Sequence, residues 1–387
     1  MSMKKMKRSS NFELLRIIGM IMIIIYHIVY HCVRVQLIDL DSIERMGNGL
    51  FSYPVFYKRL FLVQFAGSFG LIANAIFLLI SGYFLVERRR DIKLGKIGEK
   101  LLLQLGFATV MLVTASAVYF FIRCDNTRIR ISLRSVFDFN SLSWYAGYYF
   151  VVITIGAVFL NELLNEFQSP QYRAFLITVF AFVSFSWTGG LLDSLASGLR
   201  TALTGVFLYS LGGYIRKYNP FGRVKLWALV FLAAVIILLL YVSYFNVVQN
   251  GIRNFTISEA ENAGKQTLFT QPVIGISNYM AAPVILAIII FELFRRLRMP
   301  ENKVLNFAGS ATFMIYLIHD NDFWRELWRE ADWMKLLHHS SLKCCILLGK
   351  WTGIVFLSGI LTYMLYLGMM ALCRRFKWIA VRDSGQE

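Results

Sequence analysis

The amino-acid sequence predicts an all-α, polytopic membrane helix bundle with about ten transmembrane helices and both termini in the cytoplasm. Of its 387 residues, 57% are hydrophobic and only 16% are charged, whereas about a quarter of a typical soluble protein is charged. The apolar residues form long runs that are separated by short clusters of Lys and Arg. This alternation is typical of membrane proteins with positive inner loops, so the net charge of +17 does not indicate a nucleic-acid partner.

Ten apolar runs approach the roughly 20 residues that a membrane-spanning helix requires. They lie near 13–33, 66–86, 101–122, 143–164, 173–190, 199–215, 224–245, 272–294, 305–323 and 344–373. The eighth run contains Pro283, which we expect to kink its helix. The tenth run is long enough to tilt strongly or to extend past the bilayer.

The distribution of charge sets the expected orientation. Basic residues concentrate before the first run and in alternate connections between the later ones, which places those segments in the cytoplasm. The first run carries histidines and lacks a small-x-small cleavage site, so we interpret it as an uncleaved signal anchor. The chain then divides into a cytoplasmic basic N-terminus (1–12), a single membrane domain (13–373) and a cytoplasmic tail (374–387).

Four substantial connections fall on the outer face in this topology. They are 34–65, 123–142, 246–271 and 324–343. Each is too short for a separate soluble domain, and together they could form a lid over the bundle. The five cysteines show no C-x-x-C spacing and indicate neither a disulfide framework nor a metal site.

The first apolar run carries three ionisable side chains, Arg16, His27 and His31. Arg16 and His27 are eleven positions apart, so both project from one helix face, about 16 Å from each other. Ionisable groups inside a membrane helix indicate function by default. The alternative is that the histidines pack against another helix while Arg16 reaches the inner surface. His27 and His31 have the i, i+4 spacing of a zinc pair, but H-E-x-x-H and a nearby carboxylate are absent, so no metal is predicted.

A second polar cluster closes the apolar run at 309–321, where His319, Asp320 and Asn321 follow one another. This cluster is either an ordinary helix boundary or a second polar wall that faces His27. In the second case, a carboxylate beside an imidazole would fix its tautomer and raise its basicity.

Two further stretches have both a structural and a functional interpretation. Ser81 and Gly82 are small enough to let two helix backbones approach closely. The basic run that follows them includes Lys93 and Lys96. It is either the positive charge of an ordinary inner loop or a site for the phosphates of a nucleotide-bearing donor. Trp144 and Tyr145 open the fourth run. They form an aromatic belt at the interface or stack against a sugar.

Four stretches together resemble the acyltransferase 3 family of integral membrane acyltransferases, in the branch found with bacterial surface-polysaccharide assembly. The first is Glu-Leu-Leu-Arg followed by His27, and the second is F-x-x-x-S-G-Y from Phe77 to Tyr83. The third is the aromatic opening of the fourth run, and the fourth is TF-x-x-YLIHDN from Thr312 to Asn321. The sequence departs from the family at Glu13, where many members have Asp, and at Lys93 and Lys96, where many have an Arg pair.

The resemblance implies an enzyme that takes an acyl group from acyl-CoA, usually acetyl-CoA, and passes it to a hydroxyl of a polysaccharide or lipid-linked sugar. By carry-over, His27 is the essential histidine and Arg16 its partner. We expect His27, His319 and Asp320 to be catalytic, with His27 as general base or acyl relay. We expect Arg16, Ser81, Gly82, Lys93 and Lys96 to bind acyl-CoA, and Asn321, Trp144 and Tyr145 to bind the acceptor.

The expected location is the plasma membrane of a bacterial cell, where the protein takes part in polysaccharide O-acetylation of the cell envelope. The expected partners are acyl-CoA, a glycan or lipid-linked sugar and the lipid bilayer. No tightly bound cofactor and no nucleic acid are expected, and succinyl or another acyl group fits the same motifs as acetyl. A transporter or flippase for an anionic or glycan substrate, and an inactive sensor or scaffold, are the alternatives.

Overall fold

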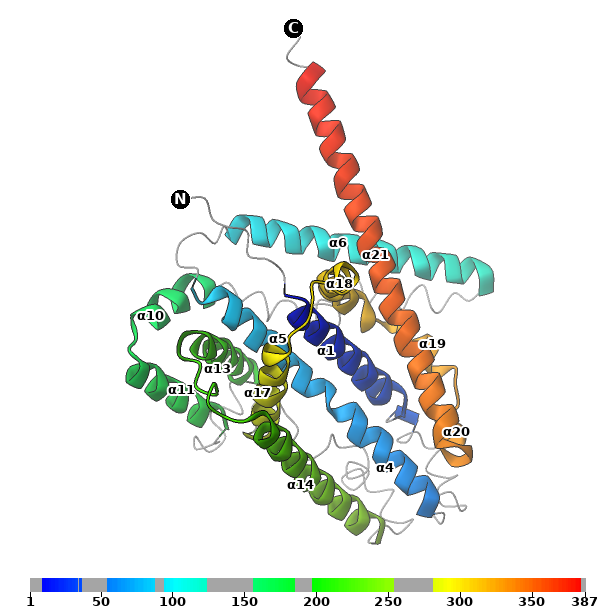
Figure 1. The fold of residues 1–387 in the computed structure, drawn as a ribbon. Helices are drawn as coiled ribbons and strands as arrows, with labels where there is room; N and C mark the ends of the chain where they lie inside the picture. Colours follow the sequence, from blue (N-terminus) through cyan, green and yellow to red (C-terminus); the bar gives the residue numbers. More distant parts are fainter. Residues whose placement is uncertain are drawn as a thin grey trace.

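Every regular element that the structure describes is a helix, as the sequence predicts (Figure 1). The computed structural model describes residues 9–33, 35–36, 54–87, 94–123, 156–184, 197–253 and 281–383. In chain order the elements are α1 (Ser10–Ile28), η1 (Val29–Val33), α4 (Pro54–Ser68), α5 (Gly70–Leu85), α6 (Leu94–Arg123), η3 (Gly156–Leu160), α10 (Asn161–Glu166), α11 (Ser169–Ser184), α13 (Ser197–Tyr218), α14 (Leu226–Arg253), α17 (Ala281–Arg296), α18 (Lys303–His319), α19 (Asp322–Arg329), α20 (Trp333–His339) and α21 (Ser341–Asp383).

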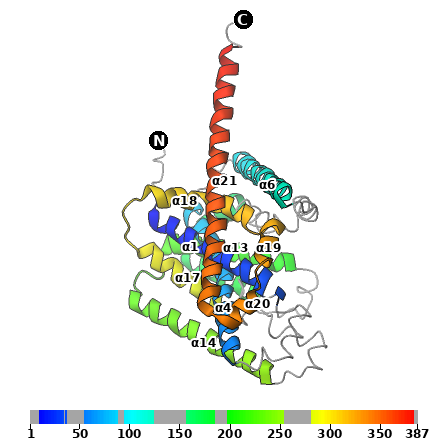
Figure 2. The same cartoon turned by 90° about the vertical axis from the view of Figure 1, so that its right-hand side faces the viewer.

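Helix α1 runs through the middle of the bundle, in contact with α4, α5, α17, α18 and α21 (Figures 1 and 2). Its apolar residues are buried on several sides, among them Leu15, Met20 and Ile24. Ser10 ties the start of α1 to α18, because its hydroxyl donates to Asn306 Oδ1 at 3.0 Å and accepts from Asn302 N at 2.9 Å. The first helix is therefore a packed central element, and its polar side chains face other helices.

Small residues let α5 and α13 approach backbone to backbone. A Cβ atom built on Gly82 would lie 1.8 Å from the carbonyl oxygen of Tyr209, and one on Gly212 would lie 2.2 Å from that of Leu79. Only glycine fits at these two points, which is the small-residue packing common between membrane helices. This contact anchors α5, the neighbour of α1, on the side away from α18 (Figure 1).

Five helical segments in the described part of the chain are long and apolar enough to cross a membrane. They are Ser10–Val33, Lys58–Leu85, Gly98–Tyr119, Leu226–Ser243 and Ser341–Cys373. Several expose large apolar side chains, such as Leu102 at 69% and Trp227 at 67%. Apolar surface of this extent is typical of contact with lipid or another protein rather than with water. The structure thus confirms an all-α membrane bundle, and the count of about ten spans stays a prediction.

Several local predictions are corrected by the helices observed. The predicted outer loop 34–65 contains most of α4, which is continuous with α5 in one span, and the predicted loop 324–343 contains α19 and α20. Pro283 is the third described residue of α17, and the residues before Ala281 lie outside the described part of the chain, so the kink at Pro283 stays a prediction.

Helix α21 extends past the bundle, as its length predicts (Figures 1 and 2). Its 43 residues would measure roughly 65 Å as a straight helix. The apolar part ends at Cys373, the predicted end of the membrane domain, and the helix continues to Asp383 through most of the predicted tail.

Candidate active site

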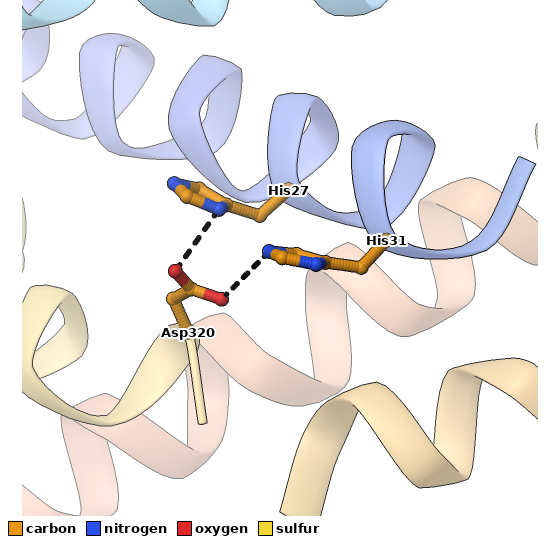
Figure 3. Close-up of side chains that lie close together, drawn as sticks. All are labelled: His27, His31 and Asp320. Atoms are coloured by element: carbon orange, nitrogen blue, oxygen red, sulfur yellow. Dashed lines mark ion pairs between the residues drawn. The ribbon is translucent and has the colours of Figure 1, made fainter. Parts of the chain in front are cut away.

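Asp320 lies between the imidazoles of His27 and His31, with one carboxylate oxygen directed at each (Figure 3). His27 occupies the last turn of α1, and Asp320 directly follows α18, whose last residue is His319. Nδ1 of His27 is 3.2 Å from Oδ2 of Asp320. The two atoms are close but not aligned for a hydrogen bond. Asp320 and His319 of the second polar cluster thus face His27, as the sequence predicts.

His31 completes the arrangement from a short π-helical segment, η1, that directly continues α1. Its Nε2 lies 3.2 Å from Oδ1 of Asp320, and its ring stacks on that of His27 with centroids 5.6 Å apart. Arg329 of α19 donates from Nε to the His31 carbonyl oxygen at 3.2 Å, which satisfies a carbonyl near the end of the helix. From the sequence, a packing role is the favoured interpretation for His31, whereas the structure brings its imidazole to the carboxylate of Asp320.

Arg325 of α19 holds the same carboxylate from the other side. Its Nη2 and Nε lie 2.7 and 2.8 Å from Oδ1 of Asp320, and its Nη1 lies 3.1 Å from Oδ1 of Asp322. A charge-assisted contact of this kind is strong, and it holds Oδ1 of Asp320 in place. Sequence reasoning missed Arg325, although the i, i+3 spacing from Asp322 is that of a helical ion pair.

His319 packs against the same cluster through its ring. Its Nδ1 lies 2.5 Å from the carbonyl oxygen of Tyr316, so Nδ1 carries the proton and Nε2 has a free lone pair. The side chain is 1% exposed, its ring stands edge-on to that of His27 at 4.8 Å, and its Nε2 has no hydrogen-bond partner among the described residues. A buried nitrogen without a partner costs free energy, so His319 is suited to bind a polar group that enters the site.

The cluster remains open to small groups from outside the protein. The side chains of His27, His31 and Asp320 are 22%, 15% and 19% exposed. One anion, one fixed cation and three imidazoles thus meet in a partly buried site, which can accept a proton from a hydroxyl group and stabilise the imidazolium that results.

Arg16 lies near the other end of α1 and does not join this cluster. Its Nη1 is 3.0 Å from Oε1 of Glu13, and its side chain is 31% exposed. Glu13 packs on Gly309 of α18, where a Cβ would come within 2.3 Å of the Glu13 carboxylate. Helix α1 therefore packs on α18 near Glu13 at one end, and His27 meets His319 and Asp320 at the other.

Other predicted site residues have structural roles or fall outside the described part of the chain. Ser81 and Gly82 are buried in α5, with Gly82 against Tyr209 of α13. Asn321 is 2% exposed, and its Oδ1 accepts from Phe323 N at 2.9 Å as the N-cap of α19. Lys93, Trp144, Tyr145 and the side chain of Lys96 lie outside the described residues.

The cluster also has the composition of a metal site, contrary to the expectation from sequence. One ligand atom from each of His27, His31 and Asp320 can be chosen so that all three lie within 4.8 Å of one another. No carboxylate follows the histidine pair in the sequence, but the fold brings Asp320 to it from the far end of the chain.

The family model described as an acyltransferase domain, acyltransferase 3, matches residues 9–369, nearly the whole chain. No curated protein matches the chain, and no solved structure does. The match includes every element of the cluster, from α1 to α19. The chain therefore belongs to the acyltransferase 3 family of multi-pass membrane proteins and is an enzyme that transfers acyl groups other than amino-acyl groups.

Proposed function

We propose that the enzyme is an O-acyltransferase of the bacterial plasma membrane that transfers acetyl from acetyl-CoA to a hydroxyl of a cell-surface or lipid-linked polysaccharide. The observation that supports this most is the position of Asp320, which touches His27 and His31 while Arg325 holds it in place. An imidazole oriented by a carboxylate is the group that an acceptor hydroxyl needs before it can attack a thioester.

His27 acts as the general base in this proposal. Because Nδ1 faces Asp320, the proton of the neutral imidazole resides on Nδ1, and Nε2 has the lone pair that receives the hydroxyl proton. The hydroxyl oxygen forms a bond to the thioester carbonyl carbon, the carbon–sulfur bond breaks, and the imidazolium returns its proton to the departing thiolate. In the relay form of the mechanism, the acyl group rests on His27 before it moves to the acceptor.

Two neighbours of His27 have supporting roles: His319 binds the acceptor, and Arg325 holds Asp320. Nε2 of His319 accepts a hydrogen bond from a sugar hydroxyl and so fixes the acceptor near His27. Arg325 contributes a positive charge within 3 Å of the Asp320 carboxylate, which favours its ionised form.

The two ends of α1 then serve the two substrates. With the N-terminus in the cytoplasm, Arg16 lies at the inner surface, where the phosphates of the donor arrive and a guanidinium can bind them. The imidazole cluster lies about 16 Å further along the helix, toward the outer face and the glycan. The predicted membrane domain, 13–373, carries both sites, and α1 extends it back to Ser10.

Purified protein in lipid nanodiscs tests this function directly. Incubation with acetyl-CoA labelled in its acetyl group and with the glycan of the producing cell should give labelled glycan, and mass spectrometry should find an O-acetyl ester. Succinyl-CoA in a parallel reaction identifies the acyl group. Absence of transfer from every acyl-CoA tried, in protein that retains its fold, would contradict the proposal.

Replacing Asp320 with asparagine should lower kcat by about 10² to 10⁴ fold, with a small effect on the KM for acyl-CoA, because the amide no longer orients Nδ1–H of His27. Asp322→Asn is the matched control, since Asp322 also pairs with Arg325 but touches no imidazole among the described residues. Acyl transfer is measured at saturating substrates. If kcat falls equally in both variants, the loss is due to the ion pairs of Arg325 and not to the orientation of His27.

A further inference from the structure

We propose that His27, His31 and Asp320 bind a divalent transition-metal ion, with Zn²⁺ the best match, and that the bound ion reversibly inhibits acyl transfer. The binding part of this inference stands on the geometry alone, and the inhibition part rests on the proposed function. The three residues come from α1, η1 and the junction of α18 with α19, so the site exists only in the folded chain (Figure 3).

The three ligand atoms lie near enough to one another for small side-chain rotations to bring them to the spacing of a zinc site. Nδ1 of His27 lies 3.2 Å from Oδ2 of Asp320, and Nε2 of His31 lies 3.2 Å from Oδ1. One ligand atom from each residue can be chosen so that all three lie within 4.8 Å of one another. Bonds of about 2.0 to 2.2 Å around a tetrahedral zinc ion place its ligand atoms roughly 3.3 to 3.6 Å apart. Small rotations of the two imidazoles toward the carboxylate would complete the set.

The donor atoms favour zinc and its neighbours over harder ions. Two imidazole nitrogens and one carboxylate oxygen suit Zn²⁺, Co²⁺ and Ni²⁺, whereas Ca²⁺ and Mg²⁺ prefer sites made of oxygen. Three protein ligands leave a fourth position for water, as at exchangeable zinc sites. All three side chains are partly exposed, but Nδ1 of His27 is itself buried, so an ion reaches this atom only when the imidazole rotates.

Arg325 limits the affinity without blocking the site. Its Nε and Nη2 both bind Oδ1 of Asp320, which leaves Oδ2 for the ion, and its Nη1 is held by Asp322. A hydrogen bond of this kind orients a ligating carboxylate from the outer shell. The positive charge of the guanidinium opposes a second cation nearby, so binding is weaker than at a structural zinc site and reversible.

Inhibition follows from the chemistry of the imidazole. When Nδ1 of His27 binds the ion, the proton of the neutral ring must reside on Nε2. Nε2 then has no lone pair to receive the proton of the acceptor hydroxyl, and Asp320 no longer orients Nδ1–H. The ion therefore occupies the base and its orienting group together.

The test measures metal binding and activity separately, on tag-free full-length protein in nanodiscs after removal of metals with a chelator. Co²⁺ should give the visible absorption bands of tetrahedral cobalt at one ion per chain, and Zn²⁺ should displace it. His31→Ala should weaken Co²⁺ binding by more than the roughly 10- to 100-fold that loss of an outer-shell partner costs. The double variant His338→Ala, His339→Ala removes the adjacent histidine pair of α20 and should bind Co²⁺ as the wild type does.

Acyl transfer is then followed at rising Zn²⁺. The wild type should lose activity and recover it when a chelator is added. For half-inhibition, measured against its own metal-free rate, His31→Ala should require a Zn²⁺ concentration at least about tenfold higher than the wild type. The proposed metal site is wrong if the wild type gives no tetrahedral cobalt spectrum. It is also wrong if the spectrum is lost in the His338/His339 double variant and kept in His31→Ala. Normal metal binding in a protein without acyl transfer would instead contradict the proposed function and leave the metal site standing.

Discussion

His27→Ala should reduce acyl transfer by at least about 10² to 10⁴ fold while the protein remains folded. The variant removes the only side chain in the described cluster that is both beside Asp320 and in ring contact with His319 and His31. If the acyl group passes through His27, no transfer should remain. The measurement is the rate of labelled acetyl transfer to glycan in nanodiscs.

His338→Ala is the control for this variant, because His338 lies on α20, away from Asp320 in the chain and outside the cluster. Both variants should retain the melting temperature of the wild type. Full activity of a well-folded His27→Ala protein would remove His27 from the mechanism.

Gly82→Ala should destabilise the whole bundle. The added methyl group would lie 1.8 Å from the carbonyl oxygen and 2.7 Å from the carbonyl carbon of Tyr209, both of which are backbone atoms. Overpacking of a well-packed interior usually costs about 1 to 3 kcal/mol, and a clash with backbone exceeds the ordinary case. Thermal unfolding in detergent, followed by size-exclusion chromatography, should show a clear fall in melting temperature and in yield.

Gly106→Ala provides the comparison, since a Cβ on Gly106 of α6 meets no atom within 4 Å. In that helix alanine should be neutral or favourable by up to about 1 kcal/mol. The experiment also decides between two roles for Gly82. If Gly82 lies on the path of the acyl-CoA arm, as the sequence suggested, Gly82→Ala should keep its stability and raise the KM for acyl-CoA.

The apolar runs predict the fold class well, because a bilayer demands long apolar helices whatever their arrangement. The shared face of Arg16 and His27 was also predictable, since helical geometry alone determines it. The pairing of His27 with Asp320 could be proposed because the first apolar run carries histidines and the run at 309–321 closes on a polar cluster. Their actual contact depends on how α1 packs on α18, which no local pattern contains.

Other features of the site lay beyond sequence reasoning for identifiable reasons. Arg325 lies on an eight-residue helix so rich in charge that it resembles a loop, and its buried face consists of Trp324 and Trp328. The Ser81-Gly82 pair has the same sequence signature for helix packing and for close approach of a ligand. Only the position of Tyr209, far along the chain, favours packing.

The π-helical segment η1 sets the rotational phase of the chain beyond His27. A π-turn closes its hydrogen bonds from i to i+5, so it holds about one residue more than an α-turn. Cys32 and Val33 are buried, and Tyr30 is directed outward, in this phase. Deleting one residue here would let a regular α-helix form and would turn either His31 or the buried pair by about 100°. The length of this segment, and not only its residue types, is therefore part of what the active site requires.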